Sequence, residues 1–109
     1  MHRYAGHLAG RSYGRLGTVL ADPPQITIHG YATMHALNRA VQRNLTTQDR
    51  LEIVRYPVVV LEQAQGYSYL FLSERGVVVL TTEGMVRTAY GPGDFDDGIR
   101  QILADAGVP

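Results

Sequence analysis

The most constraining feature of this sequence is a series of short apolar segments, separated by turns, between residues 58 and 90. The segments are Val58–Glu62, Tyr67–Leu72, Val77–Thr81 and Met85–Tyr90. They are rich in β-branched and aromatic residues, which favour strands. The turns between them have three or four residues, and such short connections join neighbouring strands in antiparallel order. The sequence therefore predicts an antiparallel four-stranded meander.

The segment Tyr31–Asn44, upstream of the meander, shows helical periodicity. Met34, Leu37 and Val41 recur at i, i+3 and i+7 and so form an apolar stripe. This spacing predicts a first helix that packs the stripe against the core.

A second, shorter helix is predicted at Thr47–Val54, with Leu51 and Val54 inward. Thr46 and Asp49 have the spacing of a capping box, in which each side chain accepts a hydrogen bond from the backbone of the other. This pair predicts where the helix begins.

A closing helix is predicted after the meander, capped by Asp94 and continuing to about Ala106. Its apolar face is formed by Phe95, Ile99, Ile102 and Leu103. The predicted fold class is α+β, with N-terminal helices packed on an antiparallel four-stranded meander and a closing C-terminal helix.

The chain of 109 residues is expected to form one compact domain after a lead-in. Repeated glycines interrupt any long helix in residues 1–25, and Asp22–Pro24 is typical of a turn or linker. We expect residues 1–25 to be a flexible lead-in or linker, with a basic arm that orders on a partner as the alternative. Residues 26–109 form the predicted functional domain. No apolar run approaches the roughly 18 residues of a membrane span, so no membrane association is expected.

The charges of the chain are unevenly distributed although its net charge is zero. Residues 1–55 hold seven Arg and three acidic residues, whereas residues 56–109 hold three Arg and seven acidic residues. All ten basic residues are Arg, which binds phosphate and carboxylate in a planar, bidentate manner. This pattern indicates an anionic partner for the first half, with an internally salt-bridged surface as the alternative. The absence of Cys excludes disulfides, thiolate metal sites and Cys catalysis.

His35, Arg39 and Arg43 form a second stripe on the first predicted helix, because they recur at i, i+4 and i+8. Two like charges at this spacing cost about 0.2–0.5 kcal/mol, so they are paired with acidic groups or used on an external anion. A neighbouring positive charge disfavours imidazolium, and a neutral imidazole is what a general base requires. His35 is therefore a candidate general base, with a purely structural histidine as the alternative.

The last predicted strand carries two hydroxyl groups that suit one phosphate. Regular alternation places Thr88 and Tyr90 on one face together with Val86, and Arg87 on the other. Hydroxyl groups two residues apart can donate two hydrogen bonds to one anion. We expect Thr88 and Tyr90 to share a pocket with His35 of the first helix.

The segment HALNRAVQRNLT at His35–Thr46, followed by a short helix, a meander and the closing Thr-x-Tyr at Thr88–Tyr90, resembles a known group of small ribonuclease toxins. The group is named for bacterial EndoU, colicin nucleases and RelE. The sequence is most similar to C-terminal toxin domains of contact-dependent inhibition and other polymorphic toxin systems. The resemblance covers about Ile26–Gly107 and includes the tail TAYGPGDFDDGIRQILADAG. It implies the fold of that group.

The activity implied by the resemblance is metal-independent endoribonuclease cleavage, with tRNA as the expected substrate. In that chemistry a 2′-hydroxyl attacks its own phosphodiester and leaves a 2′,3′-cyclic phosphate. His35 would act as general base or acid, and Arg39 would hold the phosphate. Thr88 would donate to a phosphate oxygen, and Tyr90 would be a second donor or proton-transfer partner.

Three further residues are expected to bind substrate. Arg43 would lie in the site or bind the RNA backbone, and Arg87, with Arg55 as the alternative, would replace a Lys that related toxins commonly use. His29 lies in TIHG, and a two-histidine mechanism with His35 is the alternative. No metal or cofactor is expected, because the acidic residues near Asp94 are better explained by a helix cap.

The resemblance also implies a biological setting. A toxin of this kind would be secreted or delivered at the cell surface as part of a larger protein. It would act in the target-cell cytoplasm and inhibit growth of target bacteria. A cognate immunity protein with an acidic surface would neutralise it, so a monomer or a toxin–immunity heterodimer is expected. The alternative is a non-catalytic RNA- or protein-binding module of a toxin–antitoxin type system.

Overall fold

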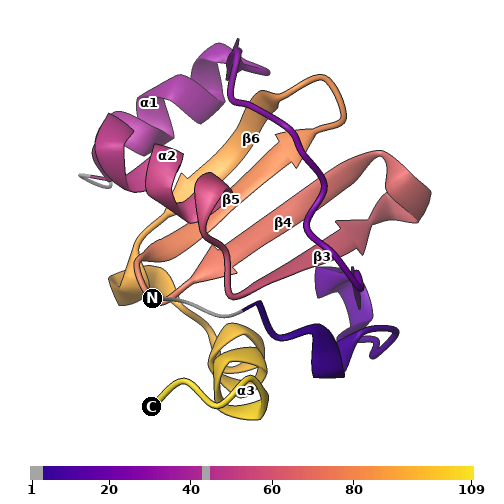
Figure 1. Cartoon of the computed structure of the whole chain (residues 1–109). Coiled ribbons are helices and arrows are strands. Elements are labelled where there is room, and N and C mark those ends of the chain that lie inside the picture. The colour runs from indigo at the N-terminus through magenta and orange to yellow at the C-terminus, as the bar shows by residue number, and fades with distance from the viewer. Residues whose placement is uncertain (1–3, 43–44) are drawn as a thin grey trace.

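A computed structural model describes residues 4–42 and 45–109, except for the side chains of residues 39–42. Its centre is a six-stranded sheet in the order β1-β3-β4-β5-β6-β2, of which Figure 1 shows the central strands. The strands are β1 (Thr18–Val19), β2 (Gly30–Tyr31), β3 (Val59–Gln63), β4 (Ser68–Ser73), β5 (Gly76–Thr81) and β6 (Met85–Tyr90). All neighbours are antiparallel except β2 and β6, which are parallel. The predicted four-stranded meander is confirmed as β3 to β6, and the structure adds the edge strands β1 and β2.

Three helices accompany the sheet, namely α1 (Met34–Gln42), α2 (Thr47–Arg55) and α3 (Asp97–Asp105). The predicted capping box begins α2. The Asp49 N–H donates to the Thr46 hydroxyl at 3.0 Å, and the Thr46 N–H donates to the Asp49 carboxylate at 3.2 Å. The predicted cap of the closing helix is wrong, since Asp94 ends a short 3₁₀ turn and the following residue is extended. Asp96 caps α3 by accepting a hydrogen bond from the Ile99 N–H at 2.9 Å.

The central strands are buried on both faces of the sheet. One cluster of buried side chains includes Val59 and Leu70 together with Ile99 and Ile102 of α3. We call this side of the sheet the α3 face. A second cluster includes Val60, Phe71, Val78 and Leu80 together with Ile53 of α2, and we call this side the α2 face. Adjacent residues of β3 alternate between the two clusters, as a pleated strand requires.

A strap of ten residues, 20–29, crosses the α2 face (Figure 1). β1 and β2 lie at opposite edges of the sheet, so the chain between them must span its whole width. Five strand spacings amount to roughly 24 Å, which an extended segment of this length can reach. Leu20, Ile26 and Ile28 pack against the α2-face cluster. The strap therefore covers part of a face that helices alone leave open.

Residues 4–19, within the segment predicted as a lead-in, contribute to the core. Ala5 and Leu8 are buried in the α3-face cluster. The Tyr13 hydroxyl donates to the Asp105 carboxylate of α3 at 2.8 Å and, with further bonds, holds the pKa of that carboxyl below its usual range. Val19 of β1 is also buried. These contacts make residues 4–19 part of the fold.

The inward faces of α1 and α2 differ from the predicted ones. Met34 is 73% exposed, whereas Ala36 is 1% exposed. On α2, Leu51 is 47% exposed, whereas Ile53 is fully buried. Leu51 lies toward the strap instead of the sheet. The predictions that Met34 and Leu51 point inward are therefore wrong.

We expect Ile53→Ala to lower the free energy of unfolding by about 2–5 kcal/mol, because it leaves a cavity in the α2-face cluster. Leu51→Ala removes the same number of carbon atoms from a half-exposed side chain and should cost about 1 kcal/mol or less. Urea unfolding followed by circular dichroism measures both values. Equal losses would contradict the assignment of Ile53 as the inward residue of α2.

Candidate functional site

α1 lies along β6 on the side of the α2 face. The Ala32 N–H, just before α1, donates to the Val86 carbonyl at 2.8 Å, and Ala36 is buried. The side chains of Tyr31 and Leu45, which flank the helical region, both belong to the α2-face cluster. The predicted neighbourhood of the first helix and the last strand is therefore present.

A β-bulge in β6 changes which of its side chains share a face. Val79 pairs with Thr88 and Leu80 pairs with Val86, so Arg87 is the extra residue. Val79 belongs to the α3-face cluster and Leu80 to the α2-face cluster. Directly opposed residues of an antiparallel pair point to the same face. Thr88 therefore lies on the α3 face and Val86 on the α2 face, and the prediction that they share a face is wrong.

Tyr90 lies on the same face as Thr88. It pairs with Val77 of the α3-face cluster, and its ring meets the Phe95 ring edge-on with the centroids 6.4 Å apart. The two residues of the predicted hydroxyl pair thus share a face, as expected. That face is the one opposite α1, so the structure does not bring Thr88 and Tyr90 to His35.

His35 is exposed in the first turn of α1. This turn is fastened by the Thr33 hydroxyl, which accepts a hydrogen bond from the Ala36 N–H at 3.0 Å. The backbone of Arg39 lies one turn further along α1, whereas its side chain is not among those that the structure describes. Arg43 lies outside the described residues. The histidine of the predicted stripe is therefore available to a ligand.

His29, at the end of the strap, is also exposed. Its N–H donates to the Gly84 carbonyl at 2.8 Å, and its Nε2 lies 3.1 Å from the Thr27 hydroxyl oxygen. β2 follows directly and pairs with the first two residues of β6. The exposed Arg87 comes next on β6. The parallel β2–β6 pair thus brings His29, the start of α1 and Arg87 to one edge of the sheet, which we call the β2–α1 edge.

One carboxylate lies in the turn beside this edge. Glu83 precedes Gly84, and hydrogen bonds from its own backbone N–H and from the Thr82 and Thr81 hydroxyls lower its pKa. The turn therefore keeps a negative charge to lower pH than an ordinary Glu would.

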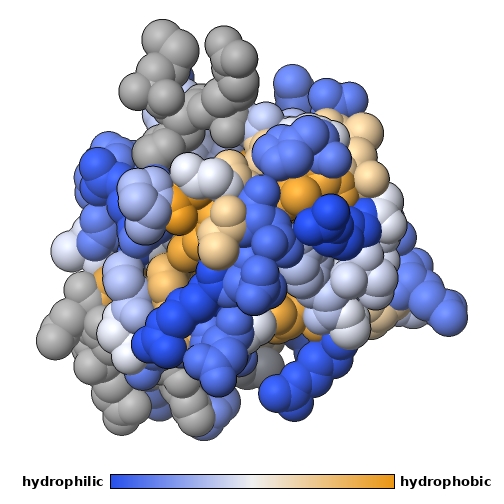
Figure 2. All heavy atoms as spheres, turned by 90° about the horizontal axis from the view of Figure 1, so that it is seen from below, coloured by the Kyte–Doolittle hydropathy of each residue, from blue (hydrophilic) through white to orange (hydrophobic). Residues whose placement is uncertain are grey.

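In the structure, arginines of one half of the chain pair with acidic residues of the other half, as Arg11 does with Asp105 and Arg75 with Asp49. α1 contains His35 and Arg39 and no acidic residue. α3 begins and ends with Asp97 and Asp105, which form ion pairs with Arg100 at 3.5 Å and with Arg11 at 3.3 Å. Figure 2 shows the molecule from below, the side on which α3 lies in Figure 1, and hydrophilic residues cover most of it. The α3 side therefore carries charges of both signs, whereas α1 carries no acidic residue.

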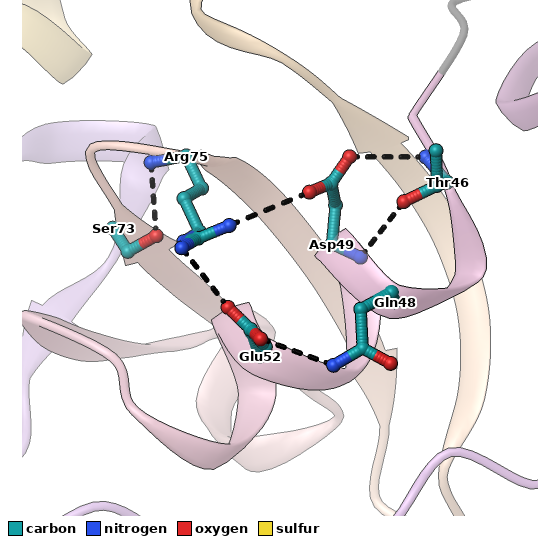
Figure 3. A network of polar contacts seen from close by, with 6 residues as sticks. All are labelled: Thr46, Gln48, Asp49, Glu52, Ser73 and Arg75. Atoms are coloured by element: carbon teal, nitrogen blue, oxygen red, sulfur yellow. Dashed lines mark hydrogen bonds and ion pairs between the residues drawn. The ribbon is translucent and has the colours of Figure 1, made fainter.

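Two arginines near α2 serve internal contacts. Arg75, in the turn between β4 and β5, forms ion pairs with Asp49 at 3.6 Å and Glu52 at 3.2 Å (Figure 3). Arg50 donates to the Thr47 hydroxyl at 3.0 Å, and its guanidinium carbon lies 5.5 Å from the centre of the Tyr31 ring. These cations hold α2 to the turn and to β2. They are therefore engaged in stabilising the fold.

Among residues 4–42 and 45–109 we find no group of three or more His, Asp or Glu side chains that could hold a metal ion. No helix in this part of the chain is long and apolar enough to cross a membrane. Comparisons with protein-family models, curated proteins and solved structures found no match.

Gly84 holds the strap against the sheet and thereby positions His29. Its φ is +86°, and an added Cβ would lie 2.1 Å from the Thr27 carbonyl oxygen and 2.8 Å from His29 Cδ2. We expect Gly84→Ala to lower the free energy of unfolding by about 2 kcal/mol or more and to shift the amide resonance of His29. Gly93→Ala is the matched control, because nothing lies within 4 Å of its added Cβ. An equally small effect of both changes would contradict the close contact at Gly84.

Proposed function

We propose that this protein is an RNA-binding domain of the ribonuclease-toxin type, and that RNA binds at the β2–α1 edge. The observation that carries the proposal is the exposure of His29, His35 and Arg87 around α1, a helix without acidic residues. The acidic residues of α3 lie across the sheet. Glu83 lies in the turn beside the edge, so it offsets the positive charge of the edge more than the α3 carboxylates do.

The chemistry of the edge favours a phosphate backbone as the partner. Arg binds phosphate through a fork of donors, and the exposed imidazole rings add further hydrogen-bonding groups. Arg39 follows His35 by one helical turn, and residues at this spacing are neighbours on a helix. Phosphate contacts of this kind supply most of the affinity in binding without sequence preference.

Cleavage of the bound RNA is the second candidate function. It draws on the resemblance to ribonuclease toxins and on the two exposed imidazoles at one edge. Because Thr88 and Tyr90 lie on the opposite face, we propose that His29 and His35 share the proton transfers and that Arg39 stabilises the phosphate. In this step one imidazole takes the proton of the 2′-hydroxyl as its oxygen attacks phosphorus. The other protonates the departing 5′-oxygen, which leaves a 2′,3′-cyclic phosphate.

The same resemblance supports a role in competition between bacteria. We propose tRNA as the substrate and a cognate immunity protein with an acidic surface that covers the β2–α1 edge. Delivery as part of a larger secreted or cell-surface protein, and action in the target-cell cytoplasm, belong to this proposal. A non-catalytic module of a toxin–antitoxin type system would use the same edge without cutting RNA.

Binding is tested by fluorescence anisotropy with labelled tRNA at several salt concentrations. We expect Arg39→Ala to weaken binding and to reduce the slope of log K against log salt by about 1, because one phosphate contact is lost. Arg100→Ala on α3 is the control and should leave the slope unchanged. If both variants change the slope alike, or if the affinity for tRNA is independent of salt, the proposal that RNA binds at this edge is wrong.

Cleavage is tested by incubating the protein with total tRNA and EDTA and by inspecting a denaturing gel. We expect fragments with 5′-hydroxyl ends, and His35→Ala should reduce the rate about 10²–10⁴-fold. Thr88→Val distinguishes the two arrangements. A loss as large as that of His35→Ala would favour the four-residue site predicted from the sequence, whereas a small effect would favour the two histidines. Intact RNA at enzyme excess would leave binding as the function.

A further inference from the structure

A groove lies between the strap and α2, and His29 of the β2–α1 edge directly follows its last strap residue, Ile28. Residues 23–28 of the strap form one wall, and Leu51, Val54 and Arg55 of α2 form the other. Its volume is about 740 Å³, within the range of sites that hold a compact ligand or a short peptide. The groove therefore has room for one extended segment of chain.

The walls of the groove are apolar and accessible. Leu51 is 47% exposed, and Val54, Ile26 and Ile28 are half-buried. A leucine at the centre of a helix, exposed beside three further aliphatic side chains, is typical of a binding surface. An apolar partner would remove these side chains from water.

The backbone of the strap keeps one unpaired N–H group on the side opposite to Gly84. Exposed Gln25 and Thr27 alternate with half-buried Ile26 and Ile28, as in a strand, although these residues pair with no strand of the sheet. The His29 N–H donates to the Gly84 carbonyl, and alternation turns the N–H groups of Gln25 and Thr27 to that same side. The N–H of Ile28 points to the other side and donates to no other residue in the described part of the chain. An extended peptide can pair with such a backbone by strand addition.

Arg55 is the ionisable residue among the described residues that line the groove. It is exposed, its guanidinium carbon lies 5.3 Å from the centre of the Tyr56 ring, and no described carboxylate lies within ion-pair distance of it. Asp49 and Glu52 of the same helix pair with Arg75 instead. The cation is therefore free to meet a carboxylate of a ligand.

We propose that this groove binds an extended peptide segment of a partner protein, with apolar side chains between Leu51 and Ile26 and a carboxylate at Arg55. Main-chain hydrogen bonds to the strap set the direction of the peptide, and the aliphatic walls supply affinity. The apolar lining disfavours RNA in this groove, so the proposal does not depend on the function of the β2–α1 edge.

The probe is a library of random nine-residue peptides displayed on phage and selected against the immobilised full chain. Each round is followed by counter-selection on the Leu51→Glu variant, in which the groove carries a charge. We expect enriched peptides that alternate apolar and polar residues and contain an Asp or Glu. No enrichment, or enrichment of peptides without an acidic residue, would overturn the proposal.

The most enriched peptide is then synthesised with a fluorescent label and titrated by anisotropy. We expect Leu51→Glu to weaken binding at least tenfold and Arg55→Glu to weaken it about threefold to tenfold, since one exposed ion pair becomes a repulsion. Arg15→Glu, at an exposed position outside the groove, is the charge-matched control and should have no effect. Equal affinity for all variants would overturn the proposal.

Two further measurements separate the proposed peptide from other occupants. A copy of the peptide with alternate N-methyl groups should bind at least tenfold more weakly, and equal binding would overturn strand addition. Light scattering of the free protein should show a monomer. A dimer that Leu51→Glu abolishes would identify a second copy as the occupant and overturn the proposal. The tRNA affinity of Leu51→Glu should stay unchanged, which distinguishes failure here from failure of the proposed RNA binding.

Discussion

The structure depends on a set of central strands that are apolar on both faces. Val59, Val60 and Leu61 are consecutive residues of β3, and all three have no exposed surface. Burial of apolar area contributes about 25 cal/mol per Å², so both faces must be covered for these strands to be stable. α3 and residues 5–19 cover one face, and α1, α2 and the strap cover the other. The chain before the first helix is therefore as necessary to the core as the helices are.

Much of the fold could be predicted from local signals. The meander follows from short turns between β-branched segments, and the capping box of Thr46 and Asp49 follows from their spacing. β1 and β2 could not be predicted, because strands of two residues have no periodicity and their pairing depends on distant parts of the chain. The prediction that Leu51 points inward is wrong because a periodic stripe shows only that a helix has an apolar side. It does not show whether that side faces the sheet or a groove.

In the candidate site, the regular alternation of side chains along a strand fails to predict which residues of β6 share a face. One inserted residue at Arg87 reverses the faces of all later residues of β6 relative to Val86, and no Gly or Pro in this strand marks the bulge. The proximity of His29 to β6 was also beyond sequence reasoning, since it arises from a parallel pair between segments more than fifty residues apart. The exposure of His35 on α1 agrees with the stripe inferred from the sequence.

The shortness of the two outermost strands has a consequence for the solution behaviour of the protein. A long, flat outer strand is a template on which further copies can add and grow into fibrils. Here each end of the sheet is closed by a strand of only two residues, and the strap that joins them continues over the face of the sheet. The kink and the charged side chain at Arg87 interrupt the outer side of β6 beyond β2. The short outer strands and the strap thus disfavour the addition of further copies to a sheet rich in valine and leucine.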